Sequence, residues 1–258
     1  MKDMDSYVSF ISNEDFERCV SNLYDSYVAA HKAIDEDKVY GNKLDVIKLT
    51  FDKHFKNLTD EELLESEVVR QIDKSITNAI GTFHEEMLGS IEGYIRGNLD
   101  GWDIKSEHDN SLFADIKNKH NTMNSSATEN LYQKLQGYAE ENSDAKCYWV
   151  QVISTKSFDE QWSASFRGKD YNHPRVRKIS GDKFYALLSG VEDALYQIYN
   201  VLPSVISAVL EKRGITESLH SQVTAVATIT NKATTTNRSL LDQLAVDNLS
   251  YYEGFDEL

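Results

Sequence analysis

The sequence predicts an α/β fold in which helices surround a mixed β-sheet. Three observations support this prediction. Apolar residues recur at helical spacing through the N-terminal third. Two short runs after residue 101 then alternate apolar and charged side chains, as strands do. The run KCYWVQVIS at 146–154 is rich in β-forming residues and suits a buried strand. The order helix, strand, strand, helix, strand is that of an α/β core with mixed strand directions.

The N-terminal third is predicted to consist of helices. Ser12 or Asn13 caps the first one, whose apolar residues follow at steps of three and four. Thr59 followed by Glu62 resembles a capping box and predicts the start of a second helix. A further amphipathic helix is predicted over 78–95.

The rest of the chain alternates strands and helices. A turn at 108–110 separates the two short strands. Pro203 is expected to kink or divide the helix that contains it. The Thr-rich run 224–238 predicts a strand or a loop. The other predicted elements are helices from Ser125 or Ser126, at 182–188, at 191–212 and from Ser239 onward, and a short strand at 162–166.

The composition is that of a folded globular protein. Hydrophobic residues make up 40% of the 258 residues, and no apolar run is long enough to cross a bilayer. The acidic N-terminus lacks the features of a signal peptide. Cys19 and Cys147 lie in apolar segments and are expected to be buried free thiols. These features predict a soluble cytoplasmic protein.

The net charge of −15 is unevenly distributed along the chain. Residues 1–100 carry −10 and residues 191–258 carry −5, whereas residues 101–190 are neutral. Within 165–185 six Lys and Arg residues face two Asp residues. Such a local basic patch can bind phosphates on an acidic protein, because charges act over roughly 8–10 Å at physiological salt. A solvated loop explains the same cations equally well.

Asp103, Asp115 and Lys117 form the most informative pattern in the chain. The two acids lie on the two short predicted strands, and Lys117 follows Asp115 as an Asp-x-Lys tripeptide. If the strands pair, alternation brings all three side chains to one side of the sheet. That arrangement would hold a divalent ion beside a phosphodiester.

Metal-dependent phosphodiester hydrolysis explains these residue types. Asp103 and Asp115, with the backbone carbonyl of Ile116, would supply hard oxygen ligands for Mg²⁺. Lys117 would position or deprotonate the attacking water. Glu85, preferred over its neighbour Glu86, would reach the metal-bound water from the preceding helix. The simpler alternative is that these residues form surface ion pairs on edge strands.

Other chemistries lack their signatures. The histidines and cysteines do not have the spacing of a zinc site, and the sequence has neither a glycine-rich phosphate loop nor a G-x-S-x-G elbow.

The block GWDIKSEHDNSLFADIKNKHNTMNSS at 101–126, preceded by RQIDKSITNAIGTFHE at 70–85, resembles the PD-(D/E)xK type II restriction endonucleases. The likeness is closest to the small group that cuts GGNCC-type sites. It runs from Asp45 to about Leu202 and includes the runs IKLTFD and VRKISGDKFYALLSG. Trp102 stands where the family pattern has proline.

The resemblance implies a nuclease-like core with a central mixed sheet, Mg²⁺-dependent double-strand cleavage and a homodimer. It matches Asp103 and Asp115 to the motif acids and Lys117 to the motif lysine, and Glu85 loosely to the helix position. The whole chain, 1–258, would be one domain: a helical part at 1–75, a catalytic core at 76–190, and a helical part at 191–258 for dimerisation or DNA recognition. A cognate methyltransferase would belong to the same system without forming a stable complex.

Reading a DNA sequence requires hydrogen-bond donors in the major groove, and arginine commonly binds guanine there. Polar and basic residues near the site and farther along the chain are the candidates. They are Lys119, His120, Asn121, Asn124, Arg167, Arg175, Arg177, Lys178, Asn237 and Arg238.

Two other functions fit the same sequence. One is a nicking or repair nuclease with this core, acting as a monomer. The other is a non-catalytic α/β protein whose acidic faces bind a protein partner.

Overall fold

The computed structural model describes residues 6–32, 36–41, 43–97, 101–119, 123–216 and 224–250. The chain divides into two compact units, which are considered separately. Unit 1 comprises residues 1–23 and 79–216, and unit 2 comprises 24–78 and 217–258. Helices α1 (Asn13–Lys32) and α4 (Asp60–Gly89) contribute residues to both units. That the chain is a single nuclease domain stays a prediction.

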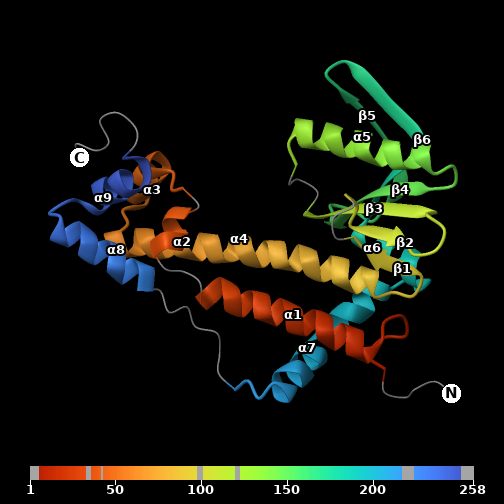
Figure 1. The fold of residues 1–258 in the computed structure, drawn as a ribbon, viewed down its shortest axis with the longest axis horizontal. Helices are drawn as coiled ribbons and strands as arrows, with labels where there is room; N and C mark the ends of the chain where they lie inside the picture. Colours follow the sequence, from red (N-terminus) through yellow and green to blue (C-terminus); the bar gives the residue numbers. More distant parts are fainter. Residues whose placement is uncertain are drawn as a thin grey trace. The chain divides into compact units, whose positions relative to one another are not determined.

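Unit 1 contains a mixed six-stranded sheet in the order β1-β2-β3-β4-β6-β5, which confirms the predicted α/β class (Figure 1). β3 runs parallel to β4 and β4 parallel to β6, while the other pairs are antiparallel. The strands are β1 (Tyr94–Arg96), β2 (Ile104–Ser106), β3 (Leu112–Lys119), β4 (Lys146–Ile153), β5 (Asp159–Phe166) and β6 (Lys169–Ser180). The helices wholly within unit 1 are α5 (Ser125–Glu141), α6 (Gly181–Ser189) and α7 (Ala194–Lys212).

Both faces of this sheet are covered, so the central strands are apolar on both sides. On one face Ala114, Ile116 and Val150 belong to a core that also contains residues of α1, α4, α6 and α7. On the other face Phe113 and Trp149 pack with a second core, to which α5 contributes Leu131, Tyr132, Leu135 and Ala139. The charged face of β3 therefore lies under α5 instead of facing solvent.

The hairpin of β5 and β6 folds over α5, so that α5 lies between the hairpin and strands β3 and β4 (Figure 1). A strand at β6 was not among the predicted elements. Hydrogen bonds join the hairpin to α5 along the whole length of the helix, from its C-terminal to its N-terminal end. They join Arg175 to the Asn142 carbonyl (2.6 Å), the His173 N–H to Tyr132 (2.7 Å), Tyr171 to Glu129 (3.0 Å) and Arg167 to Ser126 (2.9 Å). The hairpin tip consequently lies beside the N-terminus of α5.

Two of the predicted boundaries are wrong. The helix that starts after Thr59 does not end before residue 78 but continues as the single helix α4, and its N-terminus has the predicted capping box, with the Thr59 N–H donating to Glu62 at 2.8 Å. Residues 94–96, expected at the end of a helix, form β1 instead. α7 contains Pro203 without being divided there.

Unit 2 has its own helical core. α2 (Glu36–Gly41), α3 (Val46–Lys56), α8 (Thr224–Thr235) and α9 (Leu240–Leu249) pack with the first part of α4. The prediction of a strand or loop at 224–238 is wrong, because α8 is a helix. Val226, Ile229 and Ala233 recur at helical spacing and are buried, and the first two belong to this core. Their burial outweighs the strand preference of the threonines.

Asn248 joins α9 to the segment before α3. Its side chain is buried with 1% exposure, accepts from the Leu44 N–H at 3.0 Å and donates to the Leu44 carbonyl at 2.6 Å. Asn248→Ala would leave both backbone groups of Leu44 buried without partners, which is expected to cost about 2–4 kcal/mol in the free energy of unfolding. Urea denaturation checks this, with Asn231→Ala on the exposed face of α8 as the control. Equal stability of the two variants would contradict it.

Cys19 and Cys147 are buried free thiols, as expected. Burial raises the pKa of Cys19 to about 11 and that of Cys147 to about 12, so both are protonated at neutral pH. None of the helices in the described part of the chain is long and apolar enough to cross a membrane.

Candidate active site

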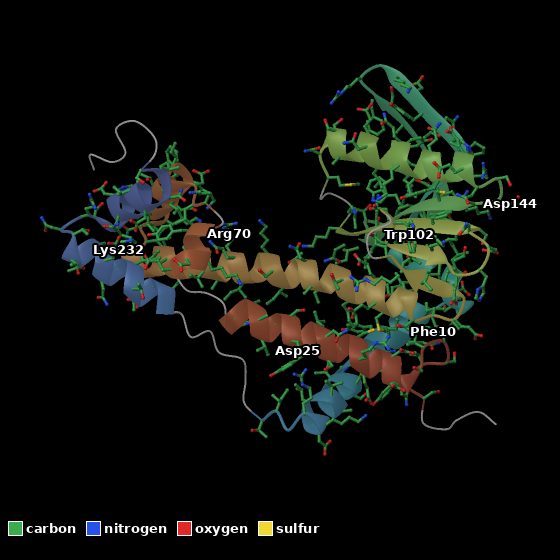
Figure 2. The ribbon with its side chains drawn as sticks, in the orientation of Figure 1. Phe10, Asp25, Arg70, Trp102, Asp144 and Lys232 are labelled. Atoms are coloured by element: carbon green, nitrogen blue, oxygen red, sulfur yellow. The ribbon has the colours of Figure 1, made fainter. Side chains whose placement is uncertain are left out.

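Strands β2 and β3 pair as the sequence predicted and bring Asp103 next to Asp115. Ile104 is opposite Ala114, and Lys105 is opposite Phe113. The Asp103 N–H donates to the Ala114 carbonyl at 2.9 Å, which extends the pairing by one residue. In this antiparallel pairing Asp103 and Asp115 occupy the same face of the sheet, below α5. The neighbouring Trp102 is labelled in Figure 2 at the sheet of unit 1.

The Asp103 carboxylate is fixed by the backbone of the opposite strand. Its Oδ2 accepts from the Ile116 N–H at 2.6 Å. On its other side the Asp103 carbonyl accepts from the Gly97 N–H at 2.9 Å. Burial, and after it the negative charge of Asp115, raises the pKa of Asp103, while the bond from Ile116 opposes that rise. A nearby cation would therefore stabilise the ionised form of this carboxylate.

Asp115 is the buried centre of the site. Its side chain is only 7% exposed, although it belongs to a charged residue. Lys117 donates to Oδ1, and Lys134 from α5 donates to Oδ2 at 2.6 Å. A surface ion pair on an edge strand would be exposed to solvent on at least one side. Asp115 lies on an interior strand beneath a helix, so the alternative of a surface ion pair on an edge strand does not describe it.

Lys117 contacts two of the three oxygen donors predicted to bind a metal. Its Nζ donates to Asp115 Oδ1 and to the Ile116 carbonyl at 3.2 Å. One ammonium group therefore occupies the space between these oxygens. The structure places Asp103, Asp115, Ile116 and Lys117 together on adjacent strands, as the spacing predicted.

The donor set fits a hard divalent cation. Two carboxylates and a backbone carbonyl are the oxygen ligands that Mg²⁺ accepts while retaining several waters. The ammonium of Lys117 shows that these oxygens already stabilise a cation. Among the described residues no three His, Cys, Asp or Glu side chains form a ready metal cage. The remaining ligands would thus come from water and the DNA phosphate.

Glu85 lies near the end of α4 and faces the same site. Burial, followed by the charge of Asp103, raises the pKa of Glu85, while Arg96 and, less strongly, Lys117 oppose that rise. Its carboxylate is paired with Arg96 of β1 at 3.0 Å. The neighbouring Glu86 also contacts Arg96, at 3.2 Å, and accepts from Asn22 at 3.1 Å. Glu85 is thus electrostatically coupled to Asp103, whereas Glu86 is held by structural contacts.

The proposed DNA-binding residues occupy different surroundings. Lys119 ends β3, and Asn124 caps α5 by accepting from the Ala127 N–H at 2.9 Å. Arg167 is 74% exposed at the hairpin tip. His120 and Asn121 lie outside the described residues. Of the others, Arg175 donates to backbone carbonyls, Arg177 pairs with Asp159, Lys178 pairs with Glu160, and Asn237 and Arg238 follow α8 in unit 2.

Lys134 is the site residue that the sequence did not reveal. It lies 17 residues after Lys117, between the buried residues Leu131 and Leu135 of α5. Its spacing matches no metal or nuclease motif. The helical stripe indicates which side of α5 faces the sheet, but not which strand residue lies beneath Lys134.

A mixed sheet that carries the buried Asp115, the partly buried Asp103 and Lys117 is consistent with the class of PD-(D/E)xK restriction endonucleases. The family model described as Eco47II restriction endonuclease matches residues 8–211, and the chain belongs to this family. It is 40% identical to the type II restriction enzyme Sau96I of Staphylococcus aureus over 247 residues, covering 92% of this chain and 94% of that protein. It is 28% identical to the type II restriction enzyme Eco47II of Escherichia coli over 217 residues, covering 81% of this chain and 90% of that protein.

The chain is therefore a type II restriction endonuclease, a site-specific deoxyribonuclease whose partner is DNA. Enzymes of this class generally need a divalent metal ion. Family membership decides against the non-catalytic interaction protein considered from the sequence.

Proposed function

We propose that this enzyme makes Mg²⁺-dependent cuts in both strands of a GGNCC-type palindrome, at the site formed by Asp103, Asp115 and Lys117. The observation that supports this assignment best is the buried Asp115 carboxylate, which is held by two ammonium groups and lies beside a second, partly buried acid, Asp103. Such a cluster is costly to bury unless it has a function or full compensation. The GGNCC sequence rests on the resemblance of residues 101–126 to enzymes that cut such sites.

In this proposal the protein residues position a cation, a phosphate and a water. Asp103, Asp115 and the Ile116 carbonyl would hold Mg²⁺, which when bound polarises the phosphate and acidifies water. The bond from the Ile116 N–H keeps Asp103 oriented. Lys117 would orient the attacking water and offset the charge that develops on the phosphate. Glu85 would accept a hydrogen bond from the same water.

DNA recognition is assigned to polar and basic residues of both units. Arg167 at the hairpin tip is well exposed, and the tip lies at the same end of α5 as Asn124. Lys119 leads out of β3 toward the proposed contacts at His120 and Asn121. We also assign Arg177 and Lys178, in addition to Arg175, Asn237 and Arg238, to contacts with bases or phosphates.

A palindromic site favours a twofold-symmetric homodimer. Helix α7 exposes Tyr196, Tyr199 and Ile206, and this apolar face supports a contact with a second copy. We place the enzyme in the cytoplasm with its DNA, where a cognate methyltransferase would act separately. Sedimentation of the purified protein tests the dimer. A monomer that nicks one strand would favour the nicking nuclease instead.

The cleavage activity is tested by incubating the purified enzyme with plasmid DNA. With Mg²⁺ we expect discrete fragments whose ends lie within GGNCC-type sequences, and with EDTA we expect intact plasmid. A plasmid methylated in vitro at these sites should resist cutting. Intact DNA with Mg²⁺ and Mn²⁺, across several plasmids that contain such sites, would refute the proposal.

A further inference from the structure

Lys134 connects α5 to the active site. The apolar residues Leu131 and Leu135 anchor this part of α5 in the core, so the position of Lys134 above the sheet is fixed by packing. Its Nζ donates to Asp115 Oδ2 at 2.6 Å and makes no second hydrogen bond within the described part of the chain. The side chain remains 34% exposed, which leaves it room to withdraw.

The charges around Asp115 are already balanced. The negative charges of Asp103 and Asp115 are balanced by the positive charges of Lys117 and Lys134, so these four residues form a neutral cluster. A divalent cation that entered this neutral cluster would give it a net charge of +2. Charges this close in a partly buried site repel strongly, because water screens them poorly. One ammonium group must therefore leave Asp115 when a cation binds.

The geometry identifies Lys134 as the group that leaves. Lys117 belongs to β3 and contacts two oxygens of that strand, whereas Lys134 holds only Oδ2 of Asp115. Withdrawal of Lys134 frees one carboxylate oxygen and leaves the Lys117 contacts intact. It also releases an ammonium group at the edge of the site.

We propose that Lys134 is a positioning residue that orients the Asp115 carboxylate in the metal-free enzyme and competes with the divalent cation for it. This inference rests on the proposed function of the site. The lysine offsets the repulsion between the buried carboxylate of Asp115 and the partly buried carboxylate of Asp103 before DNA and metal arrive. It thereby weakens metal binding by the free enzyme and keeps Asp115 in place.

Metal titration without DNA tests this role. We expect Lys134→Met to bind Mn²⁺ about tenfold more tightly than the wild type in calorimetry, because a competing positive charge is lost. Lys134→Arg retains the charge and should bind Mn²⁺ within about twofold of the wild type. Lys146→Met is the matched control, because Lys146 is exposed at the opposite end of the neighbouring parallel strand β4. It should leave the affinity unchanged.

Cleavage kinetics provide the second measurement. With Lys134→Met the Mg²⁺ concentration for half-maximal rate should decrease about tenfold, because a competing positive charge is lost. The rate at saturating Mg²⁺ should stay within about twofold of the wild type, since Lys134 has already left Asp115 in the metal-bound enzyme. A purely structural role would lower stability without tightening metal binding. If Lys134→Met does not fold, Lys134→Gln carries the same test.

The outcomes separate this inference from the proposed function. If the wild type cuts DNA but Lys134→Met binds Mn²⁺ no more tightly than Lys146→Met, the role of Lys134 is refuted and the function stands. If the wild type neither binds Mn²⁺ nor cuts DNA, both are refuted.

Discussion

Asp115→Asn and Lys117→Met are each expected to reduce DNA cleavage by about 10³-fold, the scale found when a single group that stabilises a transition state is removed. Asp115 is the shared partner of two lysines, and Lys117 contacts both Asp115 and the Ile116 carbonyl. Each change removes a charge from the proposed metal and water site. Single-turnover cleavage of a duplex containing one GGNCC sequence measures the effect.

DNA binding should survive both changes, because the phosphate contacts lie on other residues. Fluorescence anisotropy in Ca²⁺ is expected to give affinities within about fivefold of the wild type, a loss smaller than that of one good base contact. Lys146→Met controls for the loss of one positive charge at an exposed strand position. Cleavage that persists in both Asp115→Asn and Lys117→Met would move the active site elsewhere.

Gly97→Ala is expected to disturb both the stability of unit 1 and the position of Asp103. A Cβ at residue 97 would lie 2.0 Å from the Trp102 carbonyl oxygen, far closer than atoms can approach. The Gly97 N–H also donates to the Asp103 carbonyl. If the added methyl group pushes residue 97 away from Trp102, Asp103 just before β2 is displaced as well. We expect a loss of about 2–3 kcal/mol in the free energy of unfolding from overpacking. Cleavage should fall about 10²-fold, because small misplacements of reacting groups are costly.

Gly137→Ala is the matched control. Gly137 lies within α5, and a Cβ added there would meet nothing within 4 Å. Alanine favours a helix over glycine by about 0.5–1 kcal/mol, so this variant should be as stable as the wild type or more so. Thermal unfolding and cleavage are compared for both variants. A Gly97→Ala enzyme with wild-type stability and activity would show that Asp103 does not depend on this close contact.

The proximity of Asp103, Asp115 and Lys117 was predictable because these residues lie close together in sequence. Alternation along β2 and β3 fixes the face of each side chain, and the turn at 108–110 limits how the strands can pair. Asp103, Asp115 and Lys117 therefore met as expected. Lys134 was not predictable, since its contact depends on how α5 packs across the sheet after 17 further residues. Nor does local sequence show that α5 buries the charged face of β3.

The errors in the fold have the same origin. The Thr-rich residues of α8 prefer strands in isolation, yet Val226 and Ile229 are buried at helical spacing in unit 2. β6 was missed because its many cations also suit a solvated loop. In the structure the hairpin covers α5, and two of these cations, Arg177 and Lys178, pair with Asp159 and Glu160 of β5. In both α8 and β6, tertiary contacts determined the secondary structure.

A crystal structure of the enzyme with a GGNCC duplex and Mn²⁺ tests the central claim most directly. We predict anomalous density for a cation bonded to the carboxylates of Asp103 and Asp115 at about 2.1–2.2 Å, with the scissile phosphate on the same ion. Lys117 should lie beside the attacking water, and Lys134 should have left Asp115. A cation bound elsewhere near the cut phosphate, with Asp103 and Asp115 remote from it, would contradict the account.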